Sequence, residues 1–259
     1  MAEYLVQSED LTAVADAIRT KCGTDAQLTF PDGFVDAVQA ISAGTAITDG
    51  IVVKARDADG YATEVDVYGE LFDAEFAYRS NRYDQQSGWN RLKIINLKTP
   101  TKIPSACFSW LTNLETINGV ENITEIVGNQ NAGTMQSVSL IDCSFPNAIY
   151  NGNSGRVFKN CPNLETIYLP KVNGFLAGGN FIIQDCPALK TAELGSVSNG
   201  VEIGTYAFER CTQTGLTITI YCASNKADSN LSAIRNYATN ATIIIKDSTT
   251  GETLVTSTP

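Results

Sequence analysis

The most reactive side chains in the sequence belong to seven cysteines, and histidine is absent. Without histidine the chain lacks the commonest general base, the usual partner of a serine or cysteine nucleophile, and the commonest metal ligand. The cysteine count is odd and no CxxC pair occurs, so neither a zinc site nor a disulfide framework is indicated. We expect no cofactor and no bound metal. The cysteines are Cys22, Cys107, Cys143, Cys161, Cys186, Cys211 and Cys222.

Paired carboxylates are the remaining candidates for catalysis, because two of them suffice to hydrolyse a polysaccharide. Asp57 with Asp59, and Asp73 with Glu75, are such pairs. Only local sequence brings either pair together, and charged pairs on solvated turns are common in proteins that are not enzymes. We therefore expect a protein without catalytic activity, and a wall-polysaccharide hydrolase is the least favoured function.

The charge and hydropathy of the chain argue against two classes of partner. With 18 basic and 28 acidic residues the formal net charge is −10, whereas nucleic acids are held by clustered lysine and arginine. No run approaches the roughly 20 consecutive apolar residues that a membrane span needs. The first ten residues lack the basic and apolar regions of a signal peptide. We expect no nucleic-acid partner, no membrane partner, and synthesis in the cytoplasm.

Three of the cysteines mark an internal repeat. Cys161, Cys186 and Cys211 follow one another at intervals of 25 residues. An apolar residue stands three positions before each, and after the first two cysteines apolar residues recur at the same offsets. A period in the twenties with one short strand per copy is typical of a leucine-rich-repeat solenoid, whose stacked coils share one core. The matching residues are Phe158, Leu164, Ile167 and Leu169; Ile183, Leu189, Ala192 and Leu194; and Phe208.

Further copies extend the repeat in both directions. Leu111 stands where the cysteine is expected two periods before Cys161. After Cys211 the insertion at residues 212–215 shifts the next strand, so Ile218 and Ile220 should take the inward positions. The copy between that of Leu111 and that of Cys161 consists of Met135, Val138 and Leu140, after a polar and irregular loop.

Alternation along residues 166–169 predicts which side chains face the core. Ile167 and Leu169 should point inward and Tyr168 outward. The three repeated cysteines should then form an internal column, because free cysteine is among the most buried residue types. We favour this structural role over a reactive one.

The sequence pattern of the repeat is similar to that of a known family. Residues 203–211 read IGTYAFERC and residues 157–170 read VFKNCPNLETIYLP. These strings resemble BspA-like leucine-rich repeats, and the resemblance covers about residues 101–222. It is weaker around Met135 and after Cys211. The resemblance implies a repeat solenoid of the kind that serves in adhesion and recognition, without fixing a ligand.

Two short amphipathic helices are predicted in residues 1–44. Ser8 can cap the first, and Pro31 stands at a plausible first position of the second. Helices this short are marginal alone, so their apolar faces need a partner. Residues 11–41 resemble an N-terminal module of phage and prophage tail proteins, which implies an anchoring or oligomerisation segment. The apolar positions of this interface are Leu11, Val14, Ile18, Phe34, Val38 and Ile41.

Residues 45–100 should hold a β-hairpin and the cap of the solenoid. Alternating strands at 51–55 and 64–68 flank the turn sequence at 57–60. The same sequence is compatible with a calcium loop assisted by Glu64 or Asp66, but Asp-Gly is a turn dipeptide and the full ligand run is missing. An aromatic cluster follows, which is either the packed cap or a sugar platform. Its members are Phe72, Phe76, Tyr78, Tyr83 and Trp89.

The C-terminal segment should close the solenoid. Residues 229–237 have helical spacing, and strands are expected at 242–246 and 253–255. Without such a cap the last coil would expose an unpaired strand edge and apolar core. The predicted fold is thus α+β: a helical hairpin at 1–44, a small β region at 45–100, a BspA-like solenoid at 101–225 and a cap at 226–259.

We expect the chain to be a bacteriophage or prophage tail or baseplate component, a tail fibre or receptor-binding protein located in the virion. Residues 1–44 would bind other tail or baseplate proteins, and the solenoid would bind a host surface glycan or protein. A homo-oligomer is expected, with a trimer suggested by phage fibres. The alternative is a bacterial surface adhesin, which would require export. Candidate ligand contacts are Trp110, Tyr150, Tyr168, Tyr206 and Asn180.

Overall fold

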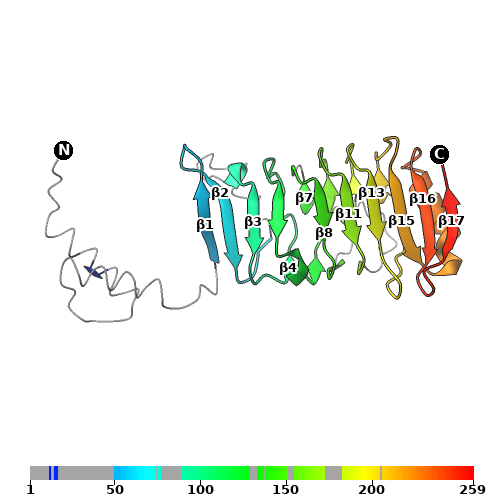
Figure 1. The fold of residues 1–259 in the computed structure, drawn as a ribbon, viewed down its shortest axis with the longest axis horizontal. Coiled ribbons are helices and arrows are strands. Elements are labelled where there is room, and N and C mark those ends of the chain that lie inside the picture. The colour runs from blue at the N-terminus through cyan, green and yellow to red at the C-terminus, as the bar shows by residue number, and fades with distance from the viewer. Residues whose placement is uncertain are drawn as a thin grey trace. The chain divides into compact units, whose positions relative to one another are not determined.

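The computed structural model separates the chain into two units, residues 1–47 and 48–259. The residues it describes are Thr12, Ala15 and Asp16, and then 50–73, 75–76, 89–128, 133–136, 138–150, 155–172, 183–204 and 206–259. The helical hairpin predicted in residues 1–44 lies outside the described residues, apart from Thr12, Ala15 and Asp16. The described part of 48–259 is a β-solenoid, with its strands side by side from β1 to β17 (Figure 1).

Each coil marked by a repeated cysteine contributes a strand to each of two sheets, where the sequence predicted one strand per coil. A two-residue strand precedes the repeated cysteine, and a longer strand follows it. The short strands pair in parallel, with Met135, Phe158, Ile183 and Phe208 in one register row. They form a four-stranded sheet of β7 (Met135–Gln136), β10 (Phe158–Lys159), β12 (Ile183–Gln184) and β14 (Phe208–Glu209).

The longer strands form a six-stranded sheet on the other side of the coils. All its pairs are parallel except the last, β16 with β17. Ile167 aligns with Ala192 and then with Ile218, and Leu169 aligns with Leu194 and then with Ile220, so the shift predicted after Cys211 is confirmed. The strands are β8 (Asp142–Ser144), β11 (Thr166–Leu169), β13 (Thr191–Leu194), β15 (Thr217–Cys222), β16 (Thr242–Asp247) and β17 (Thr253–Ser257).

The first coils are built on the predicted hairpin. Its strands β1 (Gly50–Arg56) and β2 (Ala62–Tyr68) are antiparallel, which confirms that prediction, and β2 then pairs in parallel with β3 (Ile94–Leu97) and β3 with β5 (Thr116–Asn118). A third parallel sheet holds β4 (Lys102–Ile103), β6 (Glu125–Ile126) and β9 (Ile149–Tyr150). Short 3-10 turns occupy η1 (Trp89–Arg91), η2 (Val120–Asn122) and η3 (Ser224–Lys226).

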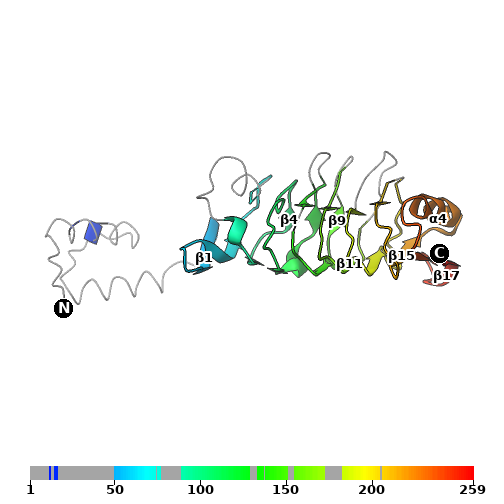
Figure 2. The ribbon, with the colours of Figure 1, turned by 90° about the horizontal axis from the view of Figure 1, so that it is seen from above.

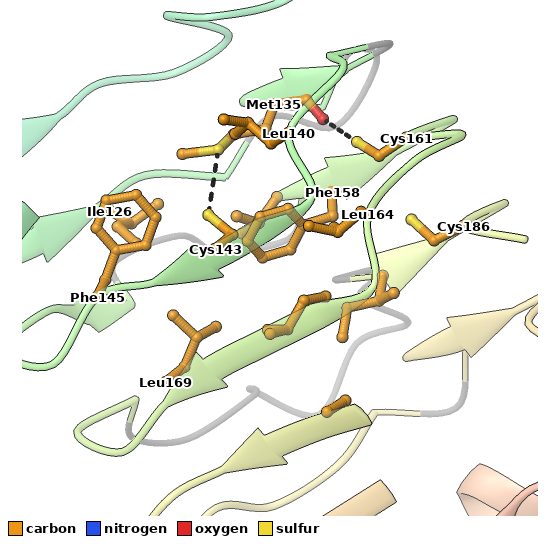
Figure 3. Packing of buried hydrophobic residues seen from close by; sticks show 14 of the residues in the cluster. Ile126, Met135, Leu140, Cys143, Phe145, Phe158, Cys161, Leu164, Leu169 and Cys186 are labelled. Carbon is orange, nitrogen blue, oxygen red and sulfur yellow. Dashed lines mark hydrogen bonds between the residues drawn. The ribbon is translucent and has the colours of Figure 1, made fainter. Parts of the chain in front are cut away.

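One apolar core runs through all the coils of the 48–259 unit. Cys161, Cys186 and Cys211 are fully buried and stand at equivalent places in successive coils, which confirms the predicted column. Figure 3 shows the first two of them beside the packed side chains of neighbouring coils. The Cys161 thiol donates a hydrogen bond to the Met135 carbonyl, 2.9 Å away, and the Cys143 thiol lies 3.8 Å from the Met135 sulfur.

The aromatic side chains before the repeats belong in part to this core. Phe76 is buried, meets Trp89 edge to face at 5.5 Å between ring centroids, and stacks on Phe108 at 5.7 Å. Phe72 is 68% exposed and takes no part in that packing. Tyr78 and Tyr83 lie outside the described residues. The cap interpretation is therefore confirmed for the two described rings that pack.

The C-terminal segment covers the last coil. Its helix α4 (Ala227–Arg235) lies behind the final strands of the six-stranded sheet (Figure 2), and Ile234 is fully buried. Asn230, only 1% exposed, accepts from the Ile203 backbone N–H and donates to the Val201 carbonyl. Arg235 donates to carbonyls of the 239–241 turn and of the chain end at 257–258. These side chains join the helix to the coil before it and to the strand after it.

The predicted α+β class is corrected for the described residues. There the chain is a β-solenoid with α4 as its one α-helix of any length, beyond the isolated helical positions at Thr12, Ala15 and Asp16. The extra strand per coil arises because residues such as Phe158 and Lys159 are extended and bonded to both neighbouring coils. Two-residue strands leave no alternation to detect in a sequence. No helix in the described residues is long and apolar enough to cross a membrane.

Candidate functional site

The outward surface of the six-stranded sheet carries two straight rows of side chains, which we call the front face. Because successive strand residues alternate in direction, the inward residues alternate with outward residues, most of which are polar. The strand register then aligns equivalent outward residues across the coils. The first row is Asp142, Thr166, Thr191, Thr217 and Thr242. The second row is Ser144, Tyr168, Glu193, Thr219 and Ile244.

Tyr168 is the aromatic residue of these two rows. It is 38% exposed, whereas Ile167 and Leu169 on either side of it are almost completely buried, as the alternation predicted. Its register neighbours are Ser144 and Glu193, a small hydroxyl side chain and a carboxylate. The ring is therefore accessible, with hydrogen-bonding groups on both sides.

A hollow of about 450 Å³ adjoins the front face, and we call it the edge groove. It lies where the chain enters β5, β8 and β11, since Glu115, Ile141 and Glu165 are the residues directly before those strands. Amide, carboxylate, hydroxyl and apolar groups all contribute to its wall. The lining residues are Asn113, Glu115, Ser139, Ile141, Asn163, Glu165 and Ala188.

The edge groove coincides with a discontinuity in the sheets. β5 and β8 belong to different sheets, and within the described residues no backbone hydrogen bond joins them. The two coils are instead connected behind, where the Phe108 and Trp110 N–H groups donate to carbonyls at 134 and 136, and by the Ser139 hydroxyl, which donates to the Thr112 carbonyl. The coil of β8 also brings an apolar residue, Ile141, to a place where both neighbouring coils have glutamate. Ile141 is 54% exposed.

Both glutamates of the edge groove are paired with lysine. Glu115 lies 3.6 Å from the Lys93 ammonium, and Glu165 lies 2.6 Å from that of Lys190. Each lysine belongs to the coil on the side away from Ile141, because the residue order along this edge is 93, 115, 141, 165 and 190. The two lysines thus pair with these carboxylates from outside the groove, and none of the residues that line the groove is basic.

The candidate contacts predicted from the sequence are not gathered at one place. Tyr168 lies on the front face, while Trp110 is 39% exposed at the end of the turn at 105–110, where its backbone N–H bonds to β7 and its φ is 71°. Tyr206 contacts Tyr237 beyond α4, with ring centroids 5.1 Å apart. The Tyr150 backbone belongs to β9, but its side chain is outside the described residues, as is all of Asn180. The predicted anchor residues lie outside them too: Leu11, Val14, Ile18, Phe34, Val38 and Ile41.

The described cysteines are buried and unpaired with one another as disulfides. Burial raises the pKa of Cys107 and Cys143, and it raises the pKa of Cys211 to about 12. A hydrogen bond with Cys161, together with burial, raises the pKa of Cys186. The thiolate is the nucleophilic form. These thiols therefore serve as core side chains.

The two carboxylate pairs take part in local structure. One Asp57 oxygen accepts the backbone N–H groups of Asp59 and Tyr61 at 3.0 and 2.9 Å, which confirms the turn interpretation. The Arg91 guanidinium lies 3.2 Å from Asp57 and 3.3 Å from Asp59. Asp73 accepts the Ser105 backbone N–H at 3.0 Å. In the part of the chain that the structure describes, no group of three or more metal-ligating side chains is assembled.

Sequence reasoning missed the edge groove, although a signal for it was present. The pentapeptide NLETI occurs at 113–117 and again at 163–167, two periods apart. It supplies the asparagine and glutamate on both sides of the groove. The copy between them reads SLIDC at 139–143, so the matched polar residues are interrupted by Ser139 and Ile141. What the sequence could not provide is the opening between β5 and β8.

Comparison with known proteins gives one match. A family model described as BspA type leucine-rich repeat region, in six copies, matches residues 87–215 and 131–254. Together these stretches span more than half of the chain. No curated protein and no solved structure matches it.

Proposed function

The chain belongs to the BspA-type leucine-rich repeat family, and we propose that it is a recognition protein without catalytic activity that acts in the tail or baseplate of a bacteriophage or prophage. In this proposal the solenoid binds a ligand on the host cell surface. Residues 1–44 attach the chain to other tail proteins and hold it as a homo-oligomer, with a trimer as the expected form.

The observation that carries the recognition role is the front face. Its rows of outward, mostly polar side chains, with Tyr168 among them, stand on a continuous core, so the surface can vary without loss of the fold. The buried thiols and the structurally engaged Asp57 and Asp73 support a binding role over a catalytic one. The repeat surface as such is consistent with adhesion or recognition.

The phage assignment is supported by the resemblance of residues 11–41 to tail-protein modules. The apolar helical faces predicted there from the sequence would need a partner, which suits a segment that docks into a larger assembly. The division of the chain after residue 47 leaves residues 48–259 with a core of their own. This division supports the two-part design that we propose, with an attachment segment and a separate receptor-binding unit.

The proposal is tested by following where the protein goes. Labelled full chain, and a chain lacking residues 1–44, are offered to assembling phage particles and to candidate host cells. We expect the full chain to enter particles and bind cells, and the shortened chain to bind cells only. Entry of the shortened chain into particles would refute the anchor assignment. Cell binding with no entry of either chain into particles would favour the surface adhesin instead.

A further inference from the structure

We infer that the edge groove, together with Tyr168, binds a neutral, hydroxyl-rich oligosaccharide. The inference rests on the proposed recognition function and assigns it a place and a ligand class. Its volume of about 450 Å³ is within the range of small-ligand sites.

The charges of the edge groove decide among anionic, cationic and neutral ligands. Glu115 and Glu165 line it with no basic residue among its walls, so an anionic ligand would be repelled. A cationic ligand would have to compete with Lys93 and Lys190, which already lie 3.6 and 2.6 Å from those carboxylates. Replacing one ammonium by another gains little. A neutral ligand suffers neither disadvantage.

The hydrogen-bonding groups of the groove suit hydroxyls. An ionised carboxylate has about four lone-pair positions and a single lysine uses only part of them. Glu115 and Glu165 can therefore accept from ligand hydroxyls while they remain paired. Asn113 and Asn163, at the first position of the two pentapeptide copies, also line the groove, and the Asn163 amide brings a donor and an acceptor to it. Such mixed donor and acceptor groups match a polyol, in which each hydroxyl both donates and accepts.

Apolar surface completes the site. Exposed Ile141 lies among the groove residues and offers contact to the carbon-bound hydrogens of a sugar ring. Tyr168 stands three residues beyond Glu165 along β11, roughly 10 Å at about 3.3 Å per residue. Its accessible ring, between Ser144 and Glu193, provides a stacking surface for a further unit of the chain. The ligand is therefore an oligomer that extends from the groove onto the front face.

The test is a printed panel of oligosaccharides probed with the full chain. Neutral hexose and N-acetylhexosamine oligomers are compared with uronic-acid oligomers and with deacetylated glucosamine oligomers. Variants Asn163→Ala and Glu165→Gln are each compared with wild type. The control is Glu202→Gln, because Glu202 is also an exposed glutamate paired with a lysine, Lys226 at 2.9 Å, and is not part of the groove. Thermal unfolding of every variant confirms that it is folded.

We expect binding to a subset of neutral oligomers. Glu165→Gln should weaken it about tenfold, because a hydrogen bond to a charged group is lost, and Asn163→Ala about two- to tenfold, because a neutral hydrogen bond is lost. The control should leave binding unchanged. Binding confined to the deacetylated or the uronic-acid oligomers would overturn the inference. So would the absence of binding to neutral oligomers, or equal binding by wild type and both groove variants. Cell binding separates the two proposals: wild type and Glu165→Gln binding cells equally would refute the groove, whereas no cell binding by wild type would refute recognition itself.

Discussion

Replacing Ile167 by alanine should destabilise the solenoid strongly, because this inward position has small neighbours. Its register partners are Cys143 in the preceding coil and Ala192 in the next. Neither can extend into the space that the substitution opens. Isoleucine-to-alanine changes in a core lower the free energy of unfolding by about 2 to 5 kcal/mol, with the larger values where the site cannot collapse. We expect about 3 to 5 kcal/mol for Ile167→Ala.

The control is the next residue on the same strand. Tyr168 is 38% exposed on the front face, and Tyr168→Ala should lower the free energy of unfolding by about 1 kcal/mol or less. For a unit the size of 48–259, each kcal/mol shifts Tm by about 2 to 4 °C, so Ile167→Ala should lower Tm by about 6 to 20 °C. Thermal unfolding followed by circular dichroism measures both. Similar Tm losses for the two variants would contradict the inward and outward assignment of β11.

Three further outcomes are expected. In a Cys22→Ser chain, which keeps the six buried thiols, a thiol reagent at neutral pH should label the protein only after unfolding; rapid labelling of the native chain would show that the column is accessible. Hydrogen bonds from the Ser224 hydroxyl and then from two backbone N–H groups lower the pKa of Asp247. The ionised carboxylate therefore stabilises the fold above the unfolded pKa near 3.9, and this stabilisation is lost as pH falls through the folded pKa. Asp247→Asn should reduce the acid dependence of the urea midpoint, and an unchanged dependence would refute this role of Asp247. Asn230→Ala leaves a buried N–H and carbonyl at 201–203 unpaired and should cost about 2 to 4 kcal/mol in chemical unfolding; a loss below about 0.5 kcal/mol would contradict this role.

The repeat could be predicted from the sequence because its core positions recur at a fixed interval. A side chain that must fill the same space in every coil recurs at the same interval, as Cys161, Cys186 and Cys211 do. The shift to Ile218 could be predicted for the same reason, since after the insertion an apolar residue must again fill the inward position next to Ala192. The period of the sequence is thus enough to predict which residues form the core of the solenoid.

The edge groove was not predictable in the same way. It depends on β5 and β8 failing to pair while the same coils remain bonded behind them. Short strands such as β10 escaped detection because two residues carry no alternation. Surface candidates chosen by residue type, such as Trp110 and Tyr206, are placed by local geometry that the repeat does not determine.

The central claim is that recognition belongs to the front face, and a matched pair of arginine substitutions tests it most directly. Thr191→Arg places the charge in an exposed position on the front face, next to Thr166 in the first row and diagonal to Tyr168. Asn160→Arg places it at the left-handed turn behind, where the equivalent Arg210 shows that arginine is accepted, with φ of 58° against 53° for Asn160. The measurement is the affinity of each full chain for the cells that wild type binds. The account predicts at least about a tenfold loss for Thr191→Arg and none for Asn160→Arg, and the reverse order would contradict it.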